Sequence, residues 1–139
     1  MVRGIGVEVV AIAELAGHVP EGAGDGVVPD GGMLDAFVRG TFTEAELAQA
    51  WGRSRPAQYL AGRLVVKKAV LKAVAPVEAL ASDGFDLRVI ECIDGEDGAP
   101  RVTLAGPLLP VLARAGTSDV LVSISNEAGL AIAFAVAQG

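Results

Sequence analysis

Four cations stand on one side of a predicted helix, with no acid among them. The segment, residues 61–74, reads AGRLVVKKAVLKAV, and its cations are Arg63, Lys67, Lys68 and Lys72. Because a helix turns by about 100° per residue, these four share one half of the cylinder, and valines and alanines fill the other half. No glutamate stands four residues away to offset the repulsion. Two interpretations stay open: a solvated face, or a polyphosphate site.

A carboxylate, Glu8, interrupts an apolar segment near the start of the chain. Apolar β-branched residues alternate around it, as in a strand. Buried Glu is rare unless it is paired, so Glu8 either has a partner in the interior or faces water from an edge strand. The preceding Gly4-Ile5-Gly6 is no dinucleotide-binding fingerprint, because a third glycine is missing and no helix follows.

A polar turn separates two very apolar segments near the end of the chain. It reads SISNEAG, residues 123–129, and offers Ser125, Asn126 and Glu127 as hydrogen-bonding side chains. Most turns of this kind only reverse the chain. Their presence alone therefore does not assign a site.

Composition excludes several classes of protein. The chain has 139 residues, enough for one domain with a core, and 52% of them are hydrophobic against 20% charged. A net charge of −6 and an isoelectric point near 4.7 argue against nucleic acid as a partner. We expect no membrane span and no signal segment, and hence a soluble, cytoplasmic protein.

The single histidine and the single cysteine exclude further chemistry. His18 lies in a glycine-rich segment, so a Ser-His-Asp triad cannot be assembled around it, and a solvated loop histidine is expected. Cys92 has no second cysteine for a disulfide or a cysteine zinc site. We expect it to pack as a small apolar side chain.

Helix signals dominate the first half of the chain after one N-terminal strand. Thr43 and Glu46 have the spacing of a capping box. The long helix is predicted to begin with Pro56 in its first turn and Ser54 as N-cap, and to end before Pro76.

The second half changes to strand signals interrupted by one short helix. The sum is an α+β fold with a late antiparallel meander, which the first strand is free to join. We predict a single domain, residues 1–139, with a flexible glycine-rich loop at 17–32. The later segments are strands at 85–93, 101–104, 119–125 and 130–137, and a helix at 107–116.

Read in order, these segments resemble the holo-[acyl-carrier-protein] synthase type of 4′-phosphopantetheinyl transferase. The resemblance implies that family's fold, an antiparallel sheet packed on a long helix, and a homotrimer with sites between subunits. It also implies transfer of phosphopantetheine from coenzyme A to a serine of an acyl carrier protein, with magnesium. It covers nearly the whole chain except the glycine-rich loop and rests on GIGVEVVAI, FTEAEL, YLAGRLVVKKAVLKAV, GAPRVTLAG and VSISNEAGLAIAFAVAQG.

The resemblance also implies a coenzyme A site. Arg63, Lys67 and Lys72 stand where the family's helix carries the basic residues that face the coenzyme A phosphates. Ser125 and Asn126, in the C-terminal motif, complete the cofactor-binding set.

Three positions depart from the family pattern, all within the implied site. Glu8 replaces the aspartate that binds magnesium, Lys68 replaces a glutamate that binds it, and Asn126 replaces a histidine. Glu8 is therefore the one candidate metal ligand, and Glu8, Lys68 and Lys72 are the candidate catalytic residues. We predict that Lys68 forms an ion pair with Glu8 in place of the metal bridge, or that its ammonium contacts the pyrophosphate directly.

These departures favour a divergent transferase in which magnesium-dependent transfer is impaired or absent. The alternative is a non-catalytic module that keeps the fold and binds coenzyme A or a carrier protein. Carrier proteins are acidic, and the family meets them with a basic early helix. Here Arg39 and His18 stand among several acids, so fast association with an acidic carrier protein is not expected.

Overall fold

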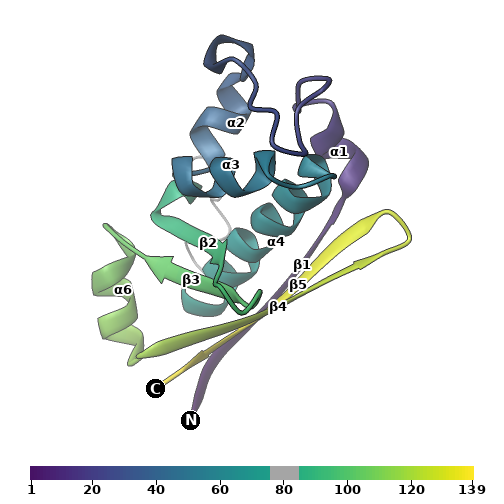
Figure 1. Cartoon of the computed structure of the whole chain (residues 1–139). Coiled ribbons are helices and arrows are strands. Elements are labelled where there is room, and N and C mark those ends of the chain that lie inside the picture. The colour runs from purple at the N-terminus through teal and green to yellow at the C-terminus, as the bar shows by residue number, and fades with distance from the viewer. Residues whose placement is uncertain (76–84) are drawn as a thin grey trace.

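The long helix α4 (Pro56–Val74) lies across one face of a three-stranded antiparallel sheet (Figure 1). This computed structural model describes residues 1–75 and 85–139. It confirms the predicted α+β class and the packing of a long helix on an antiparallel sheet. In the order in which they pair, the strands are β1 (Val2–Ala11), β5 (Leu130–Gln138) and β4 (Asp119–Glu127).

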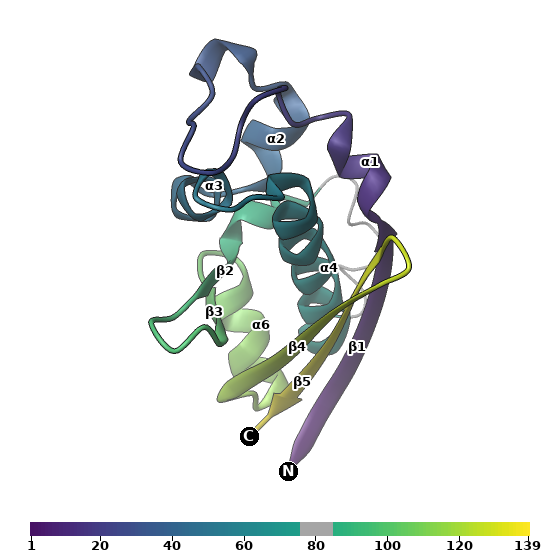
Figure 2. The same cartoon turned by 45° about the vertical axis from the view of Figure 1, so that its right-hand side comes forward.

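The other elements surround α4. Helices α1, α2 and α3 gather at its N-terminal end, while α6 and the β2–β3 hairpin lie at its side (Figures 1 and 2). The elements are α1 (Ile12–Ala16), α2 (Ala36–Thr41), α3 (Glu44–Trp51), β2 (Ile90–Asp94), β3 (Pro100–Leu104), α6 (Leu108–Ala115), and 3₁₀ turns at Gly31–Met33 and Leu87–Val89.

Small residues bring the sheet close to α4. A Cβ at Gly6 would lie 1.9 Å from the carbonyl oxygen of Ala69, and one at Gly4 would lie 1.9 Å from that of Ala73. The two glycines therefore permit close helix–strand packing, which gives a structural role to a motif that is not a nucleotide fingerprint. The middle strand adds four fully buried alanines, namely Ala131, Ala133, Ala135 and Ala137.

A two-residue turn closes the β4–β5 hairpin. Glu127 pairs with Leu130, and the intervening Ala128 and Gly129 have φ values of 50° and 79°. Two successive residues with positive φ are typical of the type I′ turn, whose twist matches that of the strands. The predicted tight connection is confirmed.

The predicted late meander is correct only in part. Strand β1 does join the C-terminal strands, through β5, but β2 and β3 pair only with each other among the described strands. Ile90 and Cys92 of β2 are fully buried, and this strand packs on α3 and α4. The hairpin is thus held by helices against its face, while α6 carries the chain from β3 to β4.

Helix signals near the middle of the chain are borne out with one exception. Thr43 Oγ1 accepts from the amide of Glu46, and the Glu46 carboxylate accepts from the amide of Thr43. Helix α4 begins at Pro56, but Arg55 is its N-cap and no side chain caps it. The prediction of Ser54 as N-cap is wrong, because proline at the first position already removes one unpaired donor. Pro76 lies outside the described residues.

The N-terminal strand ends at Ala11 and continues directly as α1, a helix that the sequence did not predict. The glycine-rich segment 17–32 contains turns and one isolated bridge between Gly24 and Val27. Its flexibility stays a prediction. Over residues 1–75 and 85–139, none of the helices combines the length and the apolar character needed to cross a membrane.

Candidate functional site

Two of the four cations of α4 are buried and two are more exposed. Arg63 and Lys67 are buried, whereas Lys68 is half-buried and Lys72 is exposed. The helix face that the sequence defined is therefore divided between the interior of the protein and its surface.

Lys67 is completely enclosed and ion-paired. Its Nζ lies 2.8 Å from Glu46 Oε1 and donates to the carbonyl oxygens of Leu87 and Ile90. Burial lowers the pKa of Lys67, and the Glu46 carboxylate opposes this shift. Because Glu46 also accepts from the amide of Cys92, the pair joins α3, α4 and β2.

Arg63 lies on the same side of α4 as Lys67, and residues of the β2–β3 hairpin hold its side chain in place. Its Nη2 donates to Asp94 at 3.1 Å, its Nη1 donates to Cys92 Sγ at 3.1 Å, and its guanidinium lies 4.1 Å from the centre of the Tyr59 ring. Asp94 also accepts from Arg53 at 2.8 Å. Cys92 is fully buried, so it packs as a small apolar side chain, as predicted, and burial raises the pKa of its thiol.

Lys72 forms the surface ion pair of the helix. Its Nζ lies 2.7 Å from Glu8 Oε2 and donates to the carbonyl oxygen of Val7 at 3.2 Å. The side chains are 48% and 23% exposed for Lys72 and Glu8, respectively. The predicted Glu8–Lys68 ion pair is therefore wrong: the partner of Glu8 is Lys72.

Helix geometry explains this choice of partner. Gly4 lies against Ala73 and Gly6 against Ala69, so β1 and α4 run in opposite directions. Helical side chains point toward the N-terminus of their helix, which brings Lys72 back toward Glu8. Lys68 is rotated about 40° further from the strand than Lys72, and it therefore points elsewhere.

Lys68 lines a hollow of about 310 Å³ between α2 and α4. Within residues 1–75 and 85–139 it makes no ion pair. Thr41 and Leu64 are among its neighbours in the hollow. One carboxylate and two ammonium groups thus lie along this edge of the helix.

This cluster does not fit a magnesium site with two carboxylates. Magnesium prefers oxygen ligands, with carboxylates among them, but Glu8 is already paired with Lys72, and the next side chain toward the N-terminus on this side of the helix, Lys68, is a cation. In the described part of the chain, no three His, Cys, Asp or Glu side chains are grouped so that they could hold a metal ion.

Asn126 belongs to a second cluster, on the other side of α4. It lines a hollow of about 290 Å³ together with Arg53, Arg55, Gln58 and Arg63. The Nε of Arg63 is buried and has no hydrogen-bond partner among the described atoms. Sequence reasoning missed Arg53, Arg55 and Gln58. The two arginines flanking Ser54 at the start of the long helix are the signal that would have found them.

Ser125 points away from that cluster. It pairs with Ile132, which pairs with Val9 of β1, and so it belongs to the sheet face opposite α4 because neighbouring residues of a strand alternate between faces. The structure therefore brings Asn126, but not Ser125, next to Arg63 within one protomer.

The two clusters lie at opposite edges of the sheet. Glu8 and Lys72 flank the β1 edge, whereas Arg63 and Asn126 flank the β4 edge. Strand β5 and the helix itself lie between them, so a single protomer does not gather the predicted residues into one pocket.

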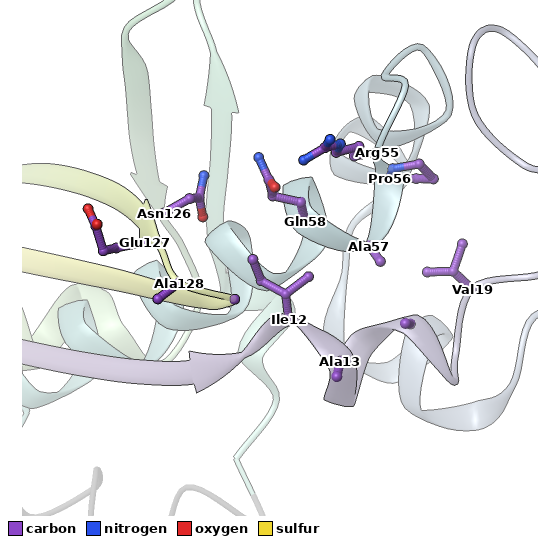
Figure 3. A pocket seen from close by; sticks show the side chains of 12 residues that line it. Ile12, Ala13, Val19, Arg55, Pro56, Ala57, Gln58, Asn126, Glu127 and Ala128 are labelled. Carbon is purple, nitrogen blue, oxygen red and sulfur yellow. The ribbon is translucent and has the colours of Figure 1, made fainter.

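A larger hollow adjoins the second cluster. It measures about 740 Å³ and lies between α1, the first turn of α4 and the β4–β5 turn. Figure 3 shows Arg55, Gln58 and Asn126 projecting beside it, while Ile12 and Val19 supply apolar walls. No pattern in the sequence predicted this hollow.

Comparison with known proteins places this geometry in a family. No family model matches the chain. The holo-[acyl-carrier-protein] synthase of Clavibacter michiganensis subsp. michiganensis is 33% identical over 139 residues, which cover 100% of this chain and 98% of the relative. The chain belongs to the holo-[acyl-carrier-protein] synthase family.

Solved structures of holo-[acyl-carrier-protein] synthases agree with this. The Neisseria meningitidis synthase has a TM-score of 0.75 at 26% identity, over 100% of both chains. The Helicobacter pylori synthase, solved in complex with coenzyme A, has a TM-score of 0.71 at 21% identity, over 96% of this chain and 99% of that one. The resemblance identified from the sequence and the fold that it implied are both confirmed.

Proposed function

We propose that this member of the holo-[acyl-carrier-protein] synthase family binds coenzyme A and acts on an acyl carrier protein as a divergent transferase, with magnesium-dependent transfer impaired or absent. The observation that carries the proposal is the full-length similarity to holo-[acyl-carrier-protein] synthases. Lys72 supplies a surface cation where the family resemblance implies the phosphates, and Lys68 adds a second one where it implies a magnesium-binding glutamate.

In the proposed reaction, a serine hydroxyl of the carrier protein attacks the phosphate that bears the pantetheine arm. The serine O–P bond forms, the bond to 3′,5′-ADP breaks, and the serine proton passes to water. Negative charge grows on the leaving oxygen, where an ammonium group stabilises it. Lys68 and Lys72 take this role, while Arg63 and Asn126, which lie together, hold the 3′-phosphate end. Ser125, on the other face of the sheet, joins this set from another copy of the chain. Lys67, enclosed by Glu46, acts by positioning α4.

A homotrimer forms part of this proposal. Alternate residues of β1, β5 and β4 make an apolar sheet face that α4 does not cover, with Ile5 67% exposed and Phe134 53% exposed. Such a face is typical of a subunit interface. Further copies of the chain are the proposed occupants, because association would also bring the β4 edge of one protomer, with Asn126 and the outward Ser125, toward another protomer's site.

An acyl carrier protein is the proposed acceptor of the phosphopantetheine group, although the charge of helix α1 is unfavourable for binding it. Helix α1 carries Glu14 and no cation, so it lacks the basic character with which the family meets acidic carrier proteins. We expect slow association, because charge complementarity sets much of the encounter rate.

One observation favours a non-catalytic alternative. The Glu8–Lys72 ion pair neutralises both groups without any ligand. A module that binds coenzyme A or a carrier protein, without transfer, is compatible with this arrangement.

A transfer assay separates the two candidates. The purified protein is incubated with coenzyme A and a panel of apo carrier proteins, with magnesium or with EDTA, and the carrier is weighed by mass spectrometry. Slow transfer, little changed by magnesium, supports the divergent transferase. Binding of coenzyme A without any mass gain supports the module, and fast, strictly magnesium-dependent transfer contradicts both.

A matched variant sharpens this assay. The triple change Glu8→Asp, Lys68→Glu and Asn126→His restores the family pattern at the three departing positions. We expect it to gain magnesium dependence and a higher transfer rate than the native protein. No gain would mean that residues outside this set also limit transfer.

A further inference from the structure

Glu8 and Lys72 neutralise each other at the position where the family resemblance implies a divalent cation. Lys72 has two acceptors there, Glu8 Oε2 at 2.7 Å and the Val7 carbonyl oxygen at 3.2 Å. Lys68 adds a second ammonium one helical turn away. Two positive charges and one negative charge leave the cluster with one positive charge.

This balance disfavours a cation. A divalent ion at Glu8 would first have to displace Lys72 and would then lie near two like charges. Side chains four residues apart on a helix are neighbours, with Cβ atoms roughly 6 Å apart, and like charges at such distances repel. Glu8 alone offers too few oxygen ligands to offset this repulsion.

An anion meets the opposite situation. A phosphate oxygen can replace the Glu8 carboxylate on Lys72, since both accept the same charge-assisted hydrogen bond from an ammonium group. Lys72 is half exposed and Glu8 is about one quarter exposed, so the exchange happens at the surface. The buried Lys67–Glu46 pair is not disturbed by it.

We propose that Glu8 competes with phosphate for Lys72 rather than binding a metal, and that a pyrophosphate-bearing ligand binds by displacing Glu8 from Lys72. This inference rests on the proposed function for the identity of the ligand, coenzyme A. The two roles of Glu8 predict opposite results when its charge is removed. If Glu8 were a metal ligand, its loss would weaken phosphate binding. If Glu8 competes for Lys72, its loss strengthens phosphate binding.

Calorimetry in EDTA with coenzyme A and with 3′,5′-ADP tests the sign of this effect. Glu8→Gln keeps the size of the side chain and removes its charge. We expect Kd to fall about two- to fivefold, the range that a partly exposed ion pair supports. Lys72→Gln should weaken binding and abolish the effect of Glu8→Gln in the double variant, because the two act through one contact.

Glu44→Gln is the matched control. Glu44 is an exposed acid in the first turn of α3, and it forms no ion pair within the described residues. The same loss of one negative charge at this position should leave Kd unchanged, which separates the local competition from the overall charge of the protein.

A melting experiment gives a readout that does not depend on the nucleotide. The native protein should melt at the same temperature in magnesium chloride and in sodium chloride of equal ionic strength, because a bound ion would stabilise it by mass action. Magnesium stabilisation, or weaker binding by Glu8→Gln, overturns the inference and leaves coenzyme A binding intact. If neither the native protein nor Glu8→Gln binds either nucleotide, with or without magnesium, the proposed function fails and the inference with it.

Discussion

Helix α4 carries two kinds of ion pair, and they lie only one turn apart. Lys67 and Glu46 are both fully buried at 2.8 Å, whereas Lys72 and Glu8 meet at 2.7 Å at the surface. The distances are nearly the same, so the difference between the pairs comes from their surroundings. Water can replace either partner of the surface pair but neither partner of the buried one.

The comparison separates residues that hold the fold from residues that are free to bind. Lys67 donates to two carbonyl oxygens besides its ion pair, and its loss would leave Glu46 alone in the interior. Lys72 and Lys68 have solvent on at least one side. Among the three lysines of this helix, exposure therefore separates Lys68 and Lys72, which are available to an anion, from Lys67, which is not.

The largest expected effect is on the buried pair. Glu46→Ala leaves the Lys67 ammonium without its carboxylate and removes the capping box of α3, so we expect a loss of about 3–5 kcal/mol of unfolding free energy. Urea unfolding measures it. Glu44→Ala, in the same helical turn but exposed, should cost less than about 0.5 kcal/mol. Equal losses of unfolding free energy for both variants would contradict the distinction between the buried ion pair and the exposed residues.

The Asp94 contacts should give an intermediate effect, because this carboxylate is mostly but not fully buried. Asp94→Ala removes the acceptor of Arg63 and Arg53, and we expect a loss of about 1.5–3 kcal/mol. Asp97→Ala, on the turn of the same hairpin, removes only exposed contacts, an ion pair with Arg101 and a hydrogen bond from the amide of Ala99, and should cost less than about 1 kcal/mol. Chemical unfolding of both variants shows which of the two loses more unfolding free energy.

The surface pair should be weakly coupled. A double-mutant cycle of Glu8→Gln and Lys72→Gln should give an interaction free energy of about 0.2–1 kcal/mol, and it should shrink at high salt. A coupling above about 2 kcal/mol would mean that this pair is held like the buried one, and a ligand would then not displace Glu8 easily.

An effect of similar, small size is expected for another surface pair, His18 and Asp35, and it depends on pH. His18 Nδ1 lies 2.6 Å from Asp35 Oδ2, and this hydrogen bond, followed by one from the amide of Val38, holds the pKa of Asp35 below its usual 3.8. The folded state therefore binds this proton less readily than the unfolded state. The resulting stability is present above pH 3.8 and is lost as the pH falls through the folded pKa.

Asp35→Asn isolates this contribution, because asparagine can still cap α2. Between pH 6 and pH 3, the unfolding free energy of the native protein, measured with urea, should fall by up to about 1 kcal/mol more than that of the variant. His18→Gln should reduce the same difference. If the unfolding free energies of all three proteins depended on pH in the same way, the role assigned to the His18–Asp35 pair would be contradicted.

The sequence by itself determined most of the helices and strands, though not α1, and it determined the family. Local signals need only neighbouring residues: the capping box of Thr43 and Glu46, the proline at the start of α4 and the polar turn after β4 all act within a few positions. The order of the motifs, from the first strand to the last hairpin, was enough to identify the family. The candidate cations were also visible as a set.

Only the tertiary structure decided what each cation does. The sequence could not show that Lys67 faces Glu46, 21 positions earlier, or that Arg63 faces Asp94, 31 positions later. It paired Glu8 with Lys68 because both depart from the family pattern, but the partner is Lys72. Two glycines set the direction and closeness of β1 against α4, and a rotation of about 40° around the helix then selects one lysine over another. Such choices depend on packing between segments far apart in the chain, which no local pattern encodes.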